Sequence, residues 1–507
     1  MLPRSNRSAI APYCVTAKQM QQIEARLFAG GMPVAALMEK VAGLILNYWL
    51  QRWSHTRSVG VLVGPGHNGG DALVVARELH LRGYQVEIYC PFDRLKPLSA
   101  DHGRYCRSLG IGWHRSLAAL ERCDRILDGL FGFGLSRPLT GQTAAAVERV
   151  NRWATPVVSI DLPSGIHTDS GAALGTAIRA DTTLCLGLWK QACLQDQALA
   201  YLGQPELIDF DIPVADIVAV LGASPPVQRL TPQRAVAALP LKRSPTAHKY
   251  TAGQLLLIAG SRQYAGAALL SGHGAVASGV GMVTLVVPES LRQLALAQLP
   301  GALVLGAPET PTGTIAALPE GLDLERYDAI ACGPGLGREI GWLPTVVDHP
   351  TPLVLDADGL NATDAEALTR RQAATIITPH PGEFRRLFID LAEAPAGEAA
   401  TAAAHQTGAV VVLKGARTVI AAGDQRWHSA IGSAALARGG SGDVLTGLAG
   451  GLLAQGEAPE AALGAVWWHA TTGCQLSQQR TLLGVDPLTL AQALPAALAQ
   501  ALEGVET

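Results

Sequence analysis

The chain is poor in charge, in aromatic residues and in paired cysteines. Of its 507 residues, 16% are charged and 5% are aromatic, and its eight cysteines include no C-x-x-C pair. Scattered cysteines argue against a disulfide framework and against a structural zinc site, and they are typical of a reducing compartment. With a formal net charge of −3, the chain also lacks the basic surplus that nucleic acid or an anionic membrane attracts.

Long apolar runs and short repeats are lacking as well. No stretch approaches the roughly 18 consecutive apolar residues that span a bilayer, and residues 1–16 have no apolar core of a secretory signal. No period typical of a solenoid recurs along the chain. We therefore expect a cytoplasmic protein without nucleic-acid or membrane contact. As a separate expectation, the protein is a homo-oligomer whose partners are small molecules.

What the chain does have is a large apolar content arranged in two regions. Hydrophobic residues make up 48% of the sequence, and its length exceeds that of an ordinary single domain. The polar, proline-containing stretch 221–235 separates the two regions, so we place the domains at 1–225 and 226–507.

Both regions alternate short apolar runs with helical segments, which predicts an α/β fold with a mostly parallel sheet in each. A long helical pattern at 16–53 is broken at Gly30 and Gly31. The expected strands are 59–63, 86–90, 125–128 and 156–160 in the first region, and 254–258, 282–287, 328–331, 352–355, 374–377 and 409–413 in the second.

The most informative motif is Gly439-Gly-Ser-Gly-Asp443, which runs directly into an apolar helical pattern. Glycines at the start of a helix leave backbone N–H groups uncovered, and that end of a helix attracts phosphate. A carboxylate beside such a cradle is suited to deprotonate a hydroxyl group that receives a phosphoryl group. The simpler interpretation is a glycine-rich turn whose aspartate caps the helix.

Other polar loops follow the predicted strands of the second region. Gly335 leaves room for a ligand to approach the backbone, and a charged side chain at Lys414 or Arg417 can pair with phosphate. His380 and Glu383 are three residues apart, so one turn can aim both inward, with the glutamate toward the water shell of a cation.

Simpler interpretations exist for several of these side chains. Asp356 and Asp358 are typical of residues that form turns. Lys414, at the end of a strand, could equally be a solvated surface charge.

In the first region, the loop Gly64–Asp71 follows the first strand and precedes a helix. Its G-x-G start suggests a dinucleotide fingerprint, but the spacing departs from G-x-G-x-x-G and no acidic residue closes the second strand. A redox domain is therefore disfavoured.

Three oxygen-bearing side chains at strand ends suggest a cation site in this region. Asn68, Asp128 and Ser164 offer an amide, a carboxylate and a hydroxyl, a set that suits a hard cation of low charge density. The alternative is that Asp128 and Asp161 only cap the turns that follow them.

Taken together, GxGHNGGDA, DGLFGFGL and SIDLPSGI resemble the N-terminal domain of NAD(P)H-hydrate epimerases in order and spacing. The resemblance implies a Rossmann-like fold and a potassium ion held by Asn68, Asp128 and Ser164. It assigns the hydrated nicotinamide to His67, Asn68, Gly69, Gly70, Asp71, Gly132, Phe133, Gly134, Leu135, Ser136, Arg137, Pro138 and Asp161. Two positions depart from the family, His67 for asparagine and Ala72 for glycine, so His67 either transfers protons or replaces an amide contact.

The series GPGLG, DADGLN, TPHPGEF, KGART and GGSGDVLTG, within 240–480, resembles ADP-dependent NAD(P)H-hydrate dehydratase, which has a ribokinase-like fold. The resemblance implies ADP as co-substrate, magnesium, and Asp443 as the catalytic residue. It assigns the hydrate to Ala267, Gly335, His380 and Asp443, and the adenine nucleotide to Lys414, Gly415, Ala416, Arg417, Thr418 and Gly442. One departure is Leu299-Pro-Gly-Ala302, where the family has a His-Pro-Glu segment, so a polar contact near the substrate is either missing or supplied from elsewhere.

Both regions thus indicate one substrate class, the hydrated nucleotides NADHX and NADPHX. The resemblance implies that the first domain interconverts their R and S epimers. It also implies that the second dehydrates the S form at the expense of ADP, giving AMP and phosphate. For proton transfer in the first domain we favour Asp161, with Asp71 and His67 as alternatives.

Two other functions remain open on the sequence alone. The second domain could be a ribokinase-like kinase for a vitamin precursor or a sugar. The first could be a non-catalytic nucleotide-binding module.

Overall fold

The computed structural model describes residues 7–505, so the first six residues of the segment 1–16 lie outside the described residues. By its internal contacts the chain divides into two compact units, Met1–Pro225 and Pro226–Thr507. Each unit is a parallel-sheet α/β structure, and the predicted fold class is confirmed.

The first unit is built on a seven-stranded sheet in which every neighbouring pair is parallel. Its strands, in spatial order, are β4 (Gly112–His114), β3 (Gln85–Tyr89), β2 (Ser58–Val63), β5 (Arg125–Gly129), β6 (Val157–Ile160), β7 (Thr182–Leu186) and β9 (Gln204–Ile208). Strand order reverses between β2 and β5, because β3 and β4 extend one way and the later strands the other. Ligands of such sheets bind at that point, beyond the carboxyl ends of the strands.

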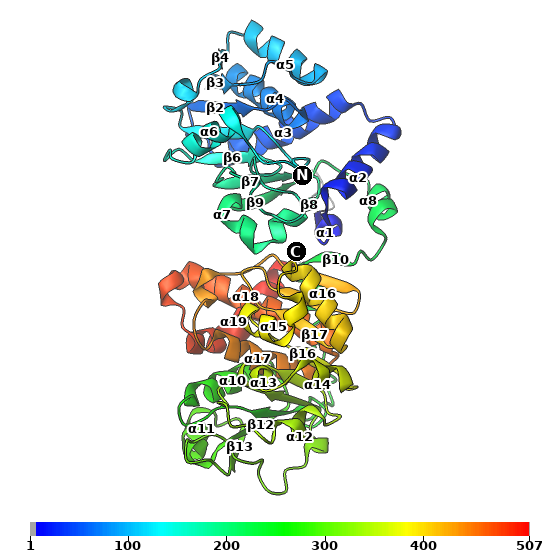
Figure 1. The fold of residues 1–507 in the computed structure, drawn as a ribbon, viewed down its shortest axis with the longest axis vertical. Coiled ribbons are helices and arrows are strands. Elements are labelled where there is room, and N and C mark those ends of the chain that lie inside the picture. The colour runs from blue at the N-terminus through cyan, green and yellow to red at the C-terminus, as the bar shows by residue number, and fades with distance from the viewer. Residues whose placement is uncertain (1–6, 506–507) are drawn as a thin grey trace. The chain divides into compact units, whose positions relative to one another are not determined.

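Helices cover both faces of this sheet (Figure 1). One core contains apolar side chains of α2, α3, α4 and α8, and the other those of α6. The helices are α1 (Arg7–Ile10), α2 (Ala17–Ala29), α3 (Val34–Arg52), α4 (His67–Leu81), α5 (Pro97–Ser108), α6 (Gly141–Val150), α7 (Leu199–Leu202) and α8 (Val214–Leu221). The predicted helix break at Gly30 and Gly31 is confirmed, because Gly31 has φ 99°. A short parallel pair, β1 (Cys14–Val15) with β8 (Trp189–Lys190), stands beside the main sheet.

The second unit has a ten-stranded sheet. Its strands, in spatial order, are β10 (Val227–Leu230), β19 (Gln425–Ser429), β18 (Val419–Ala422), β17 (Val410–Leu413), β16 (Thr375–Ile377), β15 (Leu353–Leu355), β14 (Ala329–Cys332), β11 (Gln254–Ile258), β12 (Met282–Pro288) and β13 (Leu303–Ala307). Strands β11 to β17 are parallel, whereas β17–β18 and β18–β19 are antiparallel. Here the order reverses between β11 and β14.

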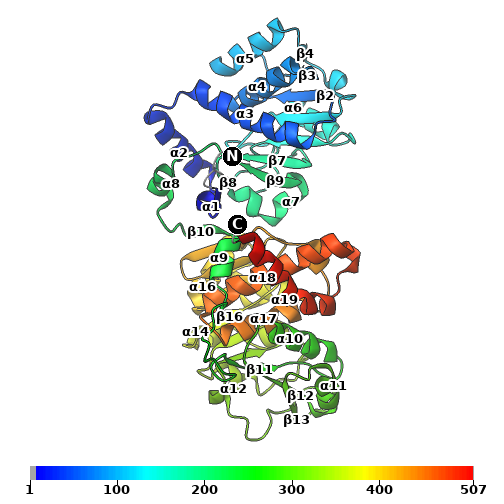
Figure 2. The ribbon, with the colours of Figure 1, turned by 180° about the vertical axis from the view of Figure 1, so that it is seen from behind.

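Two helical layers enclose this sheet, as the opposite views in Figures 1 and 2 show. One layer holds α9 (Pro232–Ala237), α10 (Ala265–Ala277), α17 (Ser441–Leu453), α18 (Ala458–Arg480) and α19 (Pro487–Val505). The other holds α12 (Leu343–Val347), α13 (Ala357–Asn361), α14 (Ala365–Arg370), α15 (Pro381–Leu387) and α16 (Ala396–Thr407), while α11 (Arg292–Gln298) lies beside β13.

Glycines bring α10 and α17 into close contact. A Cβ atom on Gly447 would lie 1.8 Å from Ser271 O, and one on Gly274 would lie 2.2 Å from Val444 O. The helix that follows the Gly439–Asp443 motif is therefore fixed in place by backbone-to-backbone packing.

No single helix of the described residues is long and apolar enough to cross a membrane. Of the described helices, only Ala17–Ala29 and Val34–Arg52, counted as one pair bent by 118°, reach the length and apolar composition of a membrane span.

Candidate active sites

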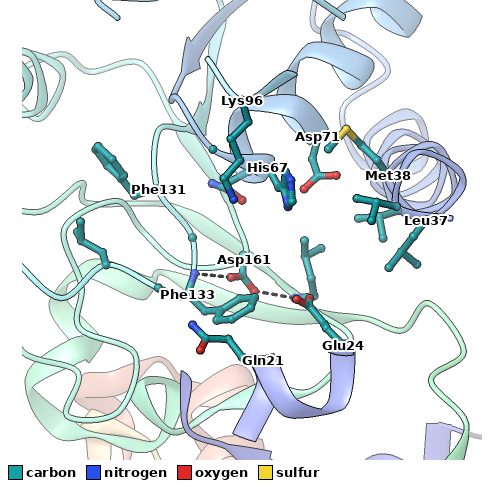
Figure 3. A pocket seen from close by; sticks show the side chains of 18 of the residues that line it. Gln21, Glu24, Leu37, Met38, His67, Asp71, Lys96, Phe131, Phe133 and Asp161 are labelled. Atoms are coloured by element: carbon teal, nitrogen blue, oxygen red, sulfur yellow. Dashed lines mark hydrogen bonds between the residues drawn. The ribbon is translucent and has the colours of Figure 1, made fainter. Parts of the chain in front are cut away.

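The first unit contains a cavity of about 510 Å³ at the carboxyl ends of its central strands (Figure 3). The structure brings most of the predicted substrate residues into its wall. They are His67, Asn68, Asp71, Gly132, Phe133, Gly134, Leu135, Ser136, Arg137 and Asp161. Side chains of α2 and α3 complete the wall, among them Glu24 and Met38.

Three predicted residues do not line this cavity: Gly69, Gly70 and Pro138. Helix α4 begins at His67, earlier than the sequence suggested, so both glycines lie within the helix and face the protein interior. A Cβ atom on Gly69 would lie 2.1 Å from Gly64 O, and one on Gly70 would lie 2.6 Å from Met38 Cε. These two glycines serve close packing.

Asp161 follows β6 and is 3% exposed, in a left-handed backbone conformation with φ 69°. Its Oδ2 atom accepts a hydrogen bond of 2.7 Å from the backbone N–H of Phe133. Its Oδ1 atom lies 2.5 Å from Lys190 Nζ. Both carboxylate oxygens are therefore occupied by donors.

Lys190 is fully buried, and its ammonium group also donates to Leu186 O at 2.5 Å. Burial alone would lower the pKa of Lys190, but the charges of Asp161 and Cys185 hold that pKa above its ordinary value. Pairing of β8 with β1 fixes the backbone at this position.

Other titratable groups of the cavity have shifted pKa values. Burial raises the pKa of Glu24 to about 7, with Asp161 adding to the shift and Lys190 and Lys96 opposing it. Burial also raises the pKa of Asp71 well above its ordinary value, and Asp161 and Glu24 reinforce this. The pKa of His67 is lowered by burial and by Lys96. In Figure 3, Glu24 points toward Asp161, whereas Asp71 lies beside His67.

Two of the three predicted potassium ligands, Asp128 and Ser164, are hydrogen-bonded to each other, and a Cβ atom on Gly129, next to Asp128, would lie 3.1 Å from Asn68 O. Asp128 has no exposed surface and accepts hydrogen bonds from Ser159 Oγ at 2.8 Å and from Ser164 Oγ at 2.6 Å. Ser164 Oγ in turn accepts from Phe131 N at 2.8 Å. Burial raises the pKa of Asp128, and these hydrogen bonds oppose the shift. Asn68 Nδ2 is buried without a hydrogen-bond partner among the described residues.

Sequence reasoning missed Glu24 and Lys190. Lys190 is the one charged residue in the apolar segment Leu184–Leu194, a signal that was available. Glu24 gave a weaker signal, because an acidic residue on an amphipathic helix is normally a solvated one.

In the second unit, the Gly439–Asp443 motif forms the start of α17, with Gly440 as N-cap at φ 98°. A Cβ atom on Gly440 would also lie 2.6 Å from Leu270 Cδ1, so glycine is required there. Asp443 lies in the first turn and does not cap the helix. Burial raises its pKa from 3.8 to about 6, with Asp356 and Asp358 adding to the shift and Lys414 opposing it.

Asp356 is an ion-paired residue, and its interpretation as a simple turn former is wrong. Its side chain is 2% exposed and lies 2.7 Å from Lys414 Nζ, while Thr446 Oγ1 donates to its other oxygen at 2.5 Å. Lys414 is therefore not a solvated surface charge. A Cβ atom on Gly442 would lie 3.6 Å from Lys414 Nζ, so this ammonium group stands at the start of α17.

His380 and Glu383 form the capping box of α15. Glu383 is 6% exposed, accepts from His380 N at 2.7 Å, and has its Oε2 atom 3.9 Å from Lys414 Nζ. The His380 side chain is 53% exposed, and its Nδ1 atom accepts from Gly382 N. Glu383 thus lies between Lys414 and His380, whose Nε2 atom is 3.5 Å from Glu383 Oε1.

The remaining predicted residues lie at the same edge of the sheet. Ala267 and Gly335 are adjacent, since a Cβ atom on Gly335 would lie 2.7 Å from Ala267 Cβ. Residues 415–418 form the turn between β17 and β18, in which Thr418 Oγ1 donates to Gly415 O at 3.2 Å. Leu299 replaces the family's polar segment and is 3% exposed, packed against Gly272.

One further side chain supports the start of α17. His469 of α18 is buried and donates through Nε2 to Ser441 O at 3.0 Å. Burial lowers its pKa from 6.5 to about 4, so it is neutral at pH 7 and keeps this donor in place.

Two protein-family models match the chain. Residues 34–192 match the model described as YjeF-related protein N-terminus, and residues 255–496 match the model described as NAD(P)H-hydrate dehydratase.

Two solved structures similar to this chain each cover about half of it. One is an ADP/ATP-dependent NAD(P)H-hydrate dehydratase from Bacillus subtilis, co-crystallised with ATP and Mg²⁺. It is 32% identical, with TM-score 0.46, and covers 54% of this chain and 98% of its own. A ribokinase-like protein from Enterococcus faecalis is 26% identical, with TM-score 0.49, and covers 54% and 96%.

Relatives with named activities match nearly the whole chain. The bifunctional NAD(P)H-hydrate repair enzyme of Thermosynechococcus vestitus is 54% identical over 97% of this chain and 98% of its own. The enzyme of the same name from Synechocystis is 52% identical over 95% and 94%. With relatives more than half identical along both units, this chain belongs to the family of bifunctional NAD(P)H-hydrate repair enzymes.

Proposed function

We propose that the first unit interconverts the R and S epimers of NADHX and NADPHX and that the second dehydrates the S epimer with ADP. The observation that carries the second assignment is the position of Asp443. This carboxyl group, with a pKa near 6, stands in the first turn of a glycine-opened helix beside Lys414.

The dehydration needs a better leaving group than hydroxide. Asp443 takes the proton of the C6 hydroxyl while the hydroxyl oxygen attacks the terminal phosphorus of ADP, and AMP leaves. The C6–O bond then breaks, the phosphate departs with the electron pair, and the lone pair of the ring nitrogen forms a double bond to C6. Loss of the proton at C5 restores the dihydropyridine ring.

The nucleotide is assigned to Lys414–Thr418 and Gly442. First-turn N–H groups of α17 have no intrahelical acceptors and can bind phosphoryl oxygens, and Lys414 Nζ adds a positive charge at the same place. The hydrate is assigned to Ala267, Gly335 and His380. Magnesium fits the acidic side chains near Lys414, because this ion is typically held by one or two carboxylates together with substrate phosphates.

A potassium ion fits the residues at the first site. Asp128 is a fully buried carboxylate whose hydrogen-bond donors are all neutral, so a monovalent cation would supply the missing counter-charge. Ser164 Oγ donates one hydrogen bond and accepts one, which leaves a lone pair for a metal ion. Bound there, the ion would anchor Asn68, Asp128 and Ser164 beside the substrate loop.

In the first unit, the substrate ring is assigned to the cavity between His67 and the loop Gly132–Arg137. Asp161 presents a fixed negative charge to this cavity. These side chains are the arrangement expected of a catalytic site, which weighs against a non-catalytic binding module.

Incubation of the purified full-length protein with hydrated NADH tests both assignments. Chromatography should show S-NADHX converted to NADH with ADP, and R-NADHX converted to S-NADHX without it. A small-molecule kinase would instead phosphorylate a thiazole or pyrimidine alcohol and recover no NADH. That outcome would replace this proposal.

A further inference from the structure

Epimerisation requires proton-transfer groups at particular positions in the cavity of the first unit. The C6 hydroxyl groups of the R and S epimers lie on opposite faces of the same ring. Interconversion by exchange of this oxygen therefore releases it from one face and adds it on the other. Such a site requires a group that gives or takes a proton on each face.

Asp161 is poorly suited to either of these roles. Lys190 Nζ lies 2.5 Å from its Oδ1 atom, and Phe133 N donates to its Oδ2 atom at 2.7 Å. Each oxygen already accepts from a donor of the protein, and Oδ1 lies against the buried ammonium group of Lys190. The fixed charge of Asp161 suits instead a ring that becomes positively charged during the reaction.

Two other carboxyl groups line the cavity from different elements. Glu24 projects from α2 and Asp71 from α4, and in Figure 3 Asp71 lies above, beside His67, while Glu24 lies below, beside Asp161. Among residues 7–505, no group donates a hydrogen bond to either carboxyl group, in contrast to Asp161. Both groups are therefore available to a substrate.

We propose that Glu24 transfers the proton on one face of the ring, opposite Asp71, while Asp161 balances the positive charge between them. This assignment rests on the placement of epimerisation in the first unit. A carboxyl group with its pKa near 7, as Glu24 has, is populated in both protonation states at neutral pH, as a residue that alternates between acid and base requires.

The step balances as follows. One carboxylic acid protonates the C6 hydroxyl, the C6–O bond breaks and water leaves with the electron pair, while the lone pair of the ring nitrogen forms the double bond to C6. Water then adds to C6 from the other face, the electron pair returns to nitrogen, and the opposite carboxylate takes the proton. Exchange with solvent restores the starting protonation states.

Conversion of R-NADHX to S-NADHX by the full-length protein without ADP tests this role. Glu24→Gln should lower the rate by roughly 10²–10⁴-fold, as loss of a general acid–base group does. Glu121→Gln, which changes an exposed carboxylate paired with Arg149, should match the wild type. Dehydration of S-NADHX with ADP should be unchanged in both variants, and so should the far-UV circular dichroism melt. A rate for Glu24→Gln within threefold of wild type would overturn the proposal.

A parallel variant separates failure of this role from failure of the site. If Asp161→Asn loses epimerisation and Glu24→Gln does not, only the role of Glu24 is wrong. If neither variant loses it, the cavity is not the epimerase site.

Two further measurements separate proton transfer from packing. The wild-type rate should depend on pH near 7, Glu24→Asp should retain a pH dependence and Glu24→Gln should lose it. The charged groups that face Glu24 in this profile are Lys190, Asp161, Lys96 and Asp71. In water labelled with ¹⁸O, each epimerisation should place the label at C6, and retention of the original oxygen would contradict the step.

Discussion

Lys190 and Asp161 form an ion pair closed off from solvent, with Nζ 2.5 Å from Oδ1 and side-chain exposures of 0% and 4%. The lysine comes from β8 and the aspartate from the end of β6, so the pair joins two parts of the first unit at the wall of its cavity. One oxygen of Asp161 is thereby paired with the ammonium group of Lys190, and the carboxylate charge becomes part of the site.

Replacing Lys190 by methionine should abolish epimerisation and destabilise the first unit. Methionine keeps the apolar stem but leaves the buried Asp161 carboxylate without a counter-ion, which typically costs about 3–5 kcal/mol. Lys40→Met is the matched control, because Lys40 pairs with Asp211 at the surface, with 38% and 61% exposure, and should cost about 1 kcal/mol or less. Urea unfolding measures both. Equal effects of the two substitutions would contradict the buried pair.

Dehydration should depend on the charge of Asp443. A base acts in its unprotonated form, so with a pKa of about 6 the rate should be constant above pH 7 and fall as the pH decreases through 6. The measurement is kcat/KM for S-NADHX at saturating ADP, with the epimerisation rate as internal comparison. A rate that stays constant down to pH 4.5 would exclude Asp443 as the base.

Replacing Asp356 by asparagine should lower the pH at which the dehydration rate begins to fall. The substitution removes a negative charge that raises the pKa of Asp443 and releases Lys414, whose charge lowers it, so both changes act in the same direction. Asparagine keeps the shape of the buried side chain. Asp424→Asn, at a side chain 90% exposed, should leave the profile in place. A dehydration rate that begins to fall at higher pH in Asp356→Asn would show that the coupling has the opposite sign.

Asp443→Asn should stabilise the second unit at high pH and not at low pH. The raised pKa means that ionisation of the buried carboxyl opposes folding. This penalty is absent below pH 3.8, grows between 3.8 and 6, and is complete above 6. Its full size is at most about 3 kcal/mol. Thermal unfolding at pH 8 and pH 4 measures the difference, and a variant less stable than wild type at pH 8 would contradict it.

Much of the fold was predictable because its strands are buried apolar runs. The central strands of both sheets, such as β2 and β11, appear as continuous apolar segments bounded by glycine. Strands β18 and β19 were missed because their antiparallel hairpin departs from the βαβ pattern and includes the polar residues Gln425 and Arg426. Edge strands such as β4 carry no apolar run.

Site residues that stand in sequence motifs could be predicted. Site residues whose role depends on a tertiary contact were harder to predict. Asp161 and Asp443 stand in motifs with chemistry of their own, and their roles stay predictions. Asp356 looked like a turn residue because its partner Lys414 is distant in sequence and the pair forms only at the carboxyl edge of the sheet. Glu24 lies on a helix whose contact with the cavity depends on how α2 folds back over the unit.

The central claim, that the chain holds two independent sites for one substrate, is tested most directly by complementation. A mixture of R- and S-NADHX is incubated with ADP and Asp161→Asn, Asp443→Asn, or both proteins together. Asp161→Asn should convert the S epimer rapidly and leave the R epimer to slow spontaneous epimerisation. Asp443→Asn should equilibrate the epimers and bind ADP, but recover NADH roughly 10²–10⁴-fold more slowly.

The two variants mixed should restore complete conversion at a rate near that of the wild type. Rapid loss of both epimers with Asp161→Asn alone, or rapid NADH recovery with Asp443→Asn alone, would contradict the account.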